Sequence, residues 1–167
     1  MKRLTILIVA ILFLGNASLL AQNQIAHINV QQLLSEMPEM KAAQAELKKI
    51  EETYKADLQN SFQEFQNKAK QYENEAPGKT QEENEKRAIE LQNIEIRLGD
   101  AQQTASQELQ KKQAELYQPI LKKANDAVQR VARAQGILYV LDSSPGTGII
   151  LADGKDLLAD VKKALGF

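Results

Sequence analysis

The residue types that carry catalysis and metal binding are scarce in this sequence. The chain has one histidine, His27, and no cysteine. The lack of cysteine excludes disulfides, thiolate zinc sites and cysteine nucleophiles. A histidine that acts as a base or a metal ligand needs partners, and no second histidine and no cysteine can join this one. We therefore interpret His27 as a packed or partly exposed strand residue, and we predict a protein that is not an enzyme and has no metal or cofactor.

Carboxylates and a glycine-containing turn near the C-terminus are the remaining candidates for a site. Asp142, Asp153 and Asp156 have oxygen atoms suited to calcium, but their spacing matches no compact loop such as the EF-hand. This favours turn and helix-cap roles for them. The Gly-Thr-Gly at 146–148 lacks the lysine and the following helix of a phosphate-binding loop.

The composition of the chain is typical of long helices. Its 167 residues include 8 Gly and 4 Pro, too few for a many-stranded β protein, and only 5% are aromatic. The 21 basic residues nearly balance the 22 acidic ones. We predict no nucleic-acid partner, because neutralising phosphates requires clustered Lys and Arg.

The first 21 residues have the features of a secretory signal peptide. Two basic residues precede an apolar run at 4–14, and Ala21 is followed by polar residues. A membrane anchor needs roughly 20 apolar residues, and polar residues interrupt this run. We expect cleavage after residue 21, export to the periplasm and no stable membrane span in the mature chain.

Two long helices are predicted in the middle of the chain. Apolar residues recur in steps of three and four over 38–75, which is the spacing of a heptad seam, and the proline at its start suits the first position of a helix. The Pro-Gly pair at 77–78 ends this helix. A capping box from Thr80 to Glu83 starts a second helix over 80–135. Because the loop is short, the two helices are expected to be antiparallel neighbours.

Short strands are predicted on both sides of the helices. Residues 25–30 are strand-like, and 137–142 and 149–152 are predicted to form a hairpin before a last helix that ends at Gly166. So small a sheet is marginal alone, and we expect several copies to share one core. The candidate residues for this oligomer contact are Ile25, Ile28, Val30, Ile137, Tyr139 and Leu141.

The predicted fold is mainly α with a small β head. A long antiparallel helical hairpin of coiled-coil type forms an arm inserted into a β/α body. The predicted domains are the signal peptide at 1–21, the oligomerisation head at 22–40 and 116–167, and the arm at 41–115, with its tip near 75–80.

The arm contains the candidate residues for contact with a bound protein. They are apolar or aromatic side chains at seam positions, namely Tyr54, Phe62, Phe65, Tyr72, Leu91 and Ile94. A seam position favours packing between the two helices. Contact of the exposed ring edges with a bound protein is the other interpretation, and both stay open.

The order of these features resembles the Skp/OmpH family of periplasmic chaperones. The resemblance covers residues 22–167, and the residues that carry it are the strand at 25–30 followed by Gln-Gln-Leu-Leu, the polar helical hairpin, Tyr-Val-Leu-Asp at 139–142 and the segment 156–161. It implies a jellyfish-like homotrimer whose arms enclose unfolded outer-membrane proteins. The implied function is that of an ATP-independent holdase, which prevents their aggregation.

The charge of the distal arm differs from that of the best-known members of this family, whose arms are strongly basic. Residues 64–95 contain five basic and eight acidic residues, a net charge of −3. The resemblance therefore implies the architecture and not the electrostatic capture of acidic proteins.

The alternative function is that of a structural coiled-coil spacer or adaptor of the cell envelope, since the length of the chain and its heptad pattern fit this function equally well.

Overall fold

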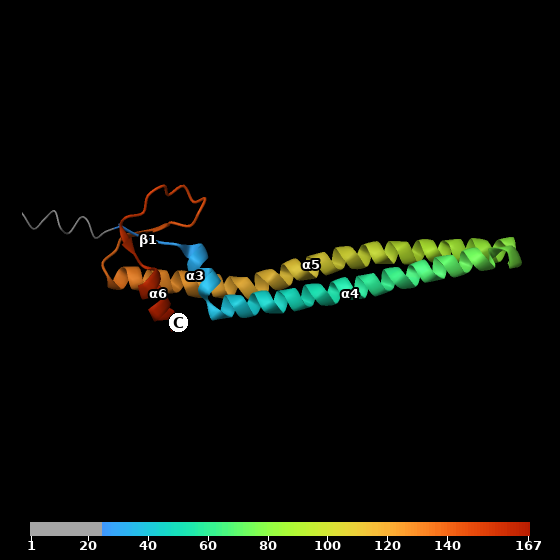
Figure 1. Cartoon of the computed structure of the whole chain (residues 1–167), viewed down its shortest axis with the longest axis horizontal. Coiled ribbons are helices and arrows are strands. Elements are labelled where there is room, and N and C mark those ends of the chain that lie inside the picture. Colours follow the sequence, from blue (N-terminus) through green and yellow to red (C-terminus); the bar gives the residue numbers. More distant parts are fainter. Residues whose placement is uncertain (1–24) are drawn as a thin grey trace, which may run out of the picture. The chain divides into compact units, whose positions relative to one another are not determined.

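The computed structural model describes residues 25–167 (Figure 1). The predicted signal peptide at 1–21 lies outside the described residues. The elements follow in the order β1, α3, α4, η1, α5, β2, β3 and α6. Among residues 25–167, no helix is both long enough and apolar enough to cross a membrane.

The described chain divides into two compact units. One consists of the described residues up to Lys41 together with Gln118–Phe167, and we call it the sheet unit. The other is Ala42–Tyr117, which we call the hairpin unit. The sheet unit joins two segments that are far apart in the sequence, and the hairpin unit pairs two helices. Each unit therefore depends on long-range packing.

Two long helices account for most of the chain. Helix α4 comprises Pro38–Glu75 and α5 comprises Gln81–Ala134. Both bounds agree to within one residue with the helices predicted at 38–75 and 80–135. Within the hairpin unit the two helices lie side by side (Figure 1). The turn between them is the short 3₁₀ helix η1, Ala76–Gly78.

The start of α5 is fixed by the predicted capping box. The backbone N–H of Glu83 donates to Oγ1 of Thr80 at 3.2 Å, and the backbone N–H of Thr80 donates to Oε2 of Glu83 at 2.9 Å. The pKa of the Glu83 carboxyl lies below its ordinary value, mainly because it accepts this backbone N–H. These bonds satisfy two amide groups that have no partner inside the helix.

Within residues 25–167 the sheet has three strands, all parallel, in the order β2-β1-β3. The central strand β1, Ile25–Ile28, pairs with β2, Tyr139–Asp142, and with β3, Lys155–Asp156. The predicted hairpin of 137–142 with 149–152 is therefore wrong, because β2 and β3 flank β1 and residues 149–152 belong to no strand. Parallel neighbours cannot be joined by a tight turn and need a long connection.

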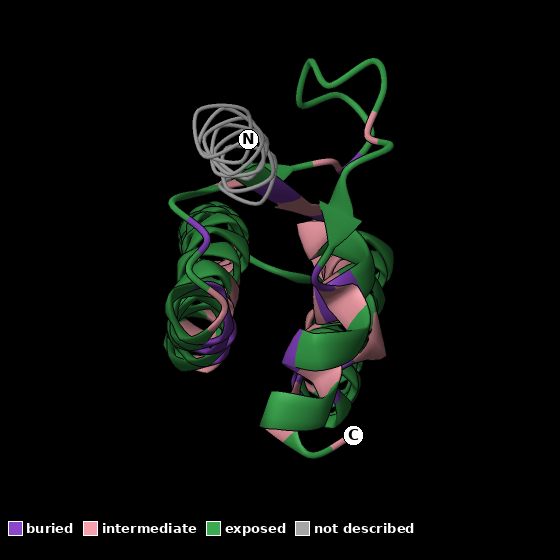
Figure 2. Ribbon diagram, turned by 90° about the vertical axis from the view of Figure 1, so that its left-hand side faces the viewer, coloured by how far each residue is buried: buried purple, intermediate pink, exposed green. Residues whose placement is uncertain are grey.

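The core of the sheet unit gathers side chains from β1, from two short helices and from the C-terminal part of α5. The N-terminus of helix α3, Val30–Glu36, is capped by Asn29, whose side chain accepts from the backbone N–H of Gln32 at 2.8 Å. Helix α6, Leu158–Leu165, ends at Gly166, whose φ of 89° favours glycine. The largest fully buried side chains are Ile28, Leu33, Met37, Leu157 and Val161. Buried residues of the strands and helices can be seen in Figure 2.

The loop between β2 and β3 is almost entirely exposed (Figure 2). Ile150 is 100% exposed and Leu151 is 75% exposed. Neighbouring large apolar side chains are normally buried, so this loop is a candidate for contact with another chain.

Candidate functional site

An apolar groove runs between the two helices of the hairpin unit. Its volume is about 690 Å³. Its apolar lining comes from both helices: Tyr54, Leu58, Phe62 and Phe65 of α4, and Leu98, Gly99, Ala105 and Leu109 of α5. We call this feature the groove. One of its walls is aromatic and the other has small residues, so the helices leave space between them here.

The aromatic wall of the groove is only partly covered. Phe62 is 52% exposed, whereas Tyr54 and Phe65 are half-buried. The rings of Phe62 and Phe65 are tilted by 32° with their centroids 6.4 Å apart, within the usual range of an aromatic pair. The wall therefore presents a paired aromatic surface that is accessible from outside the chain.

The six candidate contact residues of the hairpin do not form one site. Tyr54, Phe62 and Phe65 line the groove. Ile94 lines a neighbouring depression of about 320 Å³ that also includes Phe65. Leu91 is half-buried and Tyr72 belongs to a polar cluster, described next, so neither lines the groove.

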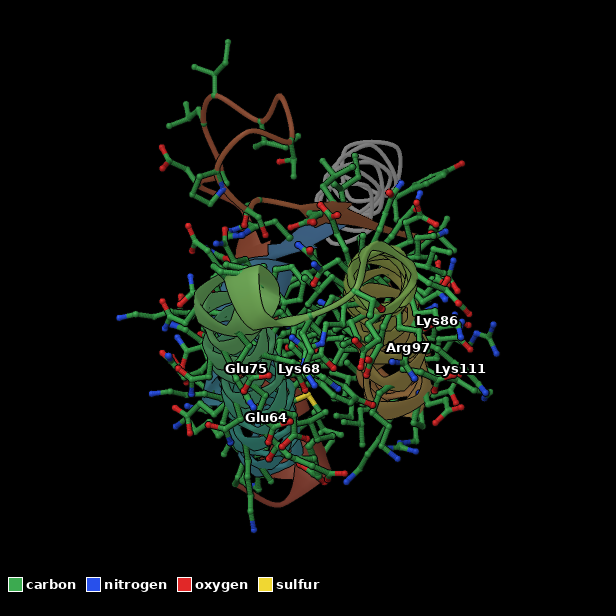
Figure 3. The ribbon with its side chains drawn as sticks, turned by 90° about the vertical axis from the view of Figure 1, so that its right-hand side faces the viewer. Glu64, Lys68, Glu75, Lys86, Arg97 and Lys111 are labelled. Carbon is green, nitrogen blue, oxygen red and sulfur yellow. The ribbon has the colours of Figure 1, made fainter. Side chains whose placement is uncertain are left out.

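The polar cluster lies near the turn and joins α4 to α5. Lys68 forms an ion pair with Glu90, and the Tyr72 hydroxyl donates to the same carboxylate at 2.6 Å. Arg87 forms an ion pair with Glu75 at 2.6 Å, and its guanidinium lies 4.5 Å from the centroid of the Tyr72 ring. In Figure 3 the labelled Lys68 side chain lies between the two helices, and that of Lys86 lies on the outer side of α5.

Hydrogen bonding changes the acidity of several groups in this cluster. The pKa of the Glu90 carboxyl is lowered, first by the bond from Lys68 and then by that from Tyr72. The same carboxylate raises the pKa of both Lys68 and Tyr72. The pKa of Glu75 is lowered by bonds from Gln71 and Arg87. The shifts of Glu90 and Glu75 favour the ionised carboxylates, and that of Lys68 favours the ammonium, so the cluster is a set of interhelical charge contacts at neutral pH.

Sequence reasoning missed part of the groove. Leu98, Ala105 and Leu109 follow the apolar periodicity of α5 and could have been assigned to a site from their spacing alone. Gly99 is different, because it lies beside the seam and no periodic signal marks it. A glycine in the middle of a helix of 54 residues was the available signal.

The candidate oligomer residues fall into two groups in the sheet unit. Ile28 and Ile137 are 1% and 6% exposed and are buried within the chain itself, and Val30 is half-buried. The exposed group is Ile25, Tyr139 and Leu141, at 54%, 64% and 43%. Other exposed apolar side chains of this unit were not in the prediction: Leu121, Leu138, Ile149, Ile150 and Leu151.

His27 connects both ends of the exposed loop to the central strand. Its Nδ1 lies 3.2 Å from Oγ of Ser143, and its Nε2 donates to the carbonyl oxygen of Gly154 at 3.2 Å. The ring is half-buried, as expected for a packed or partly exposed strand residue. Within the described residues no group of three or more His, Cys, Asp or Glu is placed to hold a metal ion.

Asp142 anchors the end of β2 to the start of α3. Its carboxylate accepts from the hydroxyl of Ser144 at 2.5 Å, from the N–H of Ser144 at 2.9 Å and from the N–H of Val30 at 3.3 Å. Slight burial acts to raise the pKa of Asp142, but these hydrogen bonds outweigh it and the pKa lies below its ordinary value. The role of Asp142 is therefore structural, as its turn position predicted.

Comparisons with known proteins identify a matching family and a solved structure with a similar fold. A family model described as outer membrane protein (OmpH-like) matches residues 24–165. The solved structure of a proposed OmpH-like outer membrane chaperone from Caulobacter crescentus CB15 matches with a TM-score of 0.76 and 22% sequence identity. This match covers 85% of the present chain and 83% of that chain. Curated proteins gave no match to the sequence.

Proposed function

Because the chain belongs to the OmpH-like family, we propose that it is a chaperone that holds unfolded outer-membrane proteins and prevents their aggregation. The similar solved structure from Caulobacter crescentus is that of a proposed OmpH-like outer membrane chaperone, which agrees with this role. We place the activity in the periplasm, after removal of the signal peptide at 1–21. The proposed mechanism needs no ATP and no bond-forming step.

The observation that supports holding is the groove with its half-exposed aromatic wall. A water-soluble helical pair normally turns such side chains toward its partner helix. Here Phe62 remains 52% exposed beside a space of about 690 Å³. A surface of this kind offers weak apolar contacts to many sequences. Several such contacts act together when more than one copy holds the same unfolded chain.

We also propose that the protein is a homotrimer joined through its sheet unit. The exposed apolar side chains Ile25, Tyr139 and Leu141 lie on two adjacent strands, since Ile25 pairs directly with Tyr139. The exposed Ile149–Leu151 segment belongs to the same unit. A small parallel sheet with two free edges and this much exposed apolar surface is marginal alone, and shared burial between copies would stabilise it.

Aggregation of an unfolded outer-membrane protein diluted from urea tests the holdase function. We expect the mature protein, without ATP, to suppress light scattering by several unrelated unfolded clients. A structural spacer or an adaptor with one folded partner would leave the scattering of all these clients unchanged. That result would contradict the proposal and favour the alternative.

The assembly is tested by mass measurement in solution. Tyr139→Asp should shift the mature protein from trimer toward monomer or unfolded chains, because it puts a charge on a 64% exposed apolar site that the trimer would bury. Tyr139→Phe is the matched control and should remain trimeric. A stable, folded monomer of the unchanged protein at micromolar concentration would refute the trimer.

A further inference from the structure

We infer that the groove binds an extended apolar or aromatic segment flanked by basic side chains. This rests on the proposed function and names the class of client sequence that the groove favours. The observations that carry it are the glycine in the groove wall, the shape and exposure of the two walls, and the charge around them.

Gly99 is the first observation. It lies inside α5, where glycine is unfavourable because the unfolded chain loses more backbone freedom on folding. The backbone of Gly99 is not in the left-handed region, and a Cβ atom at this position would meet no atom of the described residues within 4 Å, apart from its chain neighbours and the backbone of its own helix. Neither backbone conformation nor packing among the described residues therefore requires a glycine. Gly99 lines the groove, so a long side chain at this position can reach into its space.

The two walls are the second observation. Opposite the aromatic wall, the helix backbone of α5 is accessible beside Gly99, with Ala105 and Ser106 one to two turns further along. The volume of about 690 Å³ falls within the range of ligand sites in proteins. It is too small for a folded domain and suits a few side chains of an extended chain.

The charge around the groove is the third observation. Its lining includes the carboxylates of Glu51 and Glu95 and a single ammonium group, that of Lys55. None of the ion pairs in residues 25–167 involves Glu51 or Glu95. The hairpin unit as a whole has 11 basic and 15 acidic residues, a net charge of −4. Basic flanks on the bound segment would complement this charge, and acidic flanks would be repelled.

Binding of short labelled peptides to the full mature protein tests the inference. The probes share an alternating Phe-Thr core and differ only in flanking lysines or flanking glutamates. Fluorescence anisotropy should show tighter binding of the lysine-flanked peptide, with a preference that shrinks at high salt. The double variant Glu51→Gln with Glu95→Gln should reduce the preference. Glu46→Gln with Glu108→Gln is the charge-matched control outside the groove, and it should leave the preference largely intact.

A substitution that fills the groove tests its location. Gly99→Leu should weaken binding of the lysine-flanked peptide about tenfold, which corresponds to about 1.4 kcal/mol. Gln103→Leu adds the same kind of side chain at an exposed position of α5 outside the groove, and it should bind as the unchanged protein does. Gly99→Ala, a smaller change at the same site, should weaken binding less than Gly99→Leu.

Three results would overturn the inference. Equal binding by Gly99→Leu and Gln103→Leu would exclude the groove as the site, and equal or tighter binding of the glutamate-flanked peptide would exclude the charge preference. A change of oligomer mass in Gly99→Leu alone would show that a second copy of the chain fills the groove. All three can occur while the protein still suppresses client aggregation, so failure here is distinguishable from failure of the proposed function.

Discussion

The hydroxyl of Tyr72 on α4 donates a 2.6 Å hydrogen bond to the carboxylate of Glu90 on α5. Lys68 reaches the same carboxylate from one turn earlier on α4, and Arg87 lies over the Tyr72 ring from α5. The contact therefore fixes which turn of α4 faces which turn of α5. A heptad seam alone permits slippage by whole heptads, whereas this set of polar contacts is satisfied in one register only.

Removing the Tyr72 hydroxyl should weaken the pairing of the two helices near the turn. Tyr72→Phe keeps the ring and its contact with Arg87 but loses the bond to Glu90. We expect a lower Tm and faster hydrogen exchange of backbone amides around 68–90. Tyr54→Phe is the control, because the Tyr54 hydroxyl makes no hydrogen bond to protein among the described residues. Equal Tm and exchange in the two variants would show that the bond contributes nothing.

The cluster should also make the hairpin unit sensitive to acid. The pKa of Glu90 is lowered in the folded protein, chiefly by its bond with Lys68, from an ordinary value of 4.5. A lowered folded-state pKa gives stability that is fully present above the ordinary pKa and is lost as pH falls through the folded one. Helicity and Tm should therefore be constant near neutral pH and fall below about pH 4.5. Glu90→Gln should flatten this fall. An unchanged acid profile in that variant would contradict the assignment.

Gly99→Ala should stabilise the hairpin unit by about 1 kcal/mol. The reason is that alanine restricts the unfolded backbone and finds open space in the folded chain. Gly166→Ala is the opposite case, because Gly166 has a φ of 89° and alanine is strained there by about 1–2 kcal/mol. Urea titration of the free energy of unfolding should show the two changes with opposite signs. A destabilising Gly99→Ala would mean that the backbone at this point needs glycine.

The sheet unit should depend strongly on one fully buried leucine. Leu33 is 0% exposed, and Leu33→Ala should cost about 2–5 kcal/mol because it removes buried methyl groups and leaves a cavity. Ile96→Ala is the control, since Ile96 is 55% exposed and a surface change of this kind is expected within about 0.5 kcal/mol. Similar losses in both variants would show that Ile96 is covered in the assembled protein.

The long helices could be predicted because their signals are local. A proline at the first position of α4, a Pro-Gly break and the Thr80–Glu83 capping box are all contained within a few residues of the helix ends they determine. The heptad spacing also indicated which side chains face the other helix. It could not show that the helices leave the groove open, because this depends on the sizes of residues facing each other across the pair.

The sheet could not be predicted in the same way. The apolar run at 149–152 has the composition of a strand, yet β3 is the polar pair Lys155–Asp156. What makes this pair a strand is its register against β1, where His27 faces Asp156 from more than a hundred residues away. His27 likewise binds Ser143 and Gly154 at the two ends of the loop. No local pattern contains such partners.

A paired deletion in α4 and α5 can remove the groove while retaining the polar cluster and the turn. The ion pairs of Lys68 with Glu90 and of Glu75 with Arg87 show the register of α4 against α5. In that register, deleting 54–64 from α4 and 96–106 from α5 takes eleven facing residues, about three helical turns, from each helix and rejoins the apolar seam with a four-residue step in both. Because the sheet unit is untouched, we expect a folded protein with the oligomer mass of the unchanged chain.

This shortened chain should lose most of its protection of an unfolded outer-membrane protein, measured by light scattering, because Tyr54, Leu58, Phe62 and the wall around Gly99 are gone. The matched control deletes one heptad from each helix between the groove and the sheet unit, at 44–50 and 110–116, which shortens the hairpin but keeps the groove. If both deletions lose protection equally, the length of the helices and not the groove holds the client. If neither does, the binding surface lies in the sheet unit, and the exposed Ile149–Leu151 segment becomes the place to test.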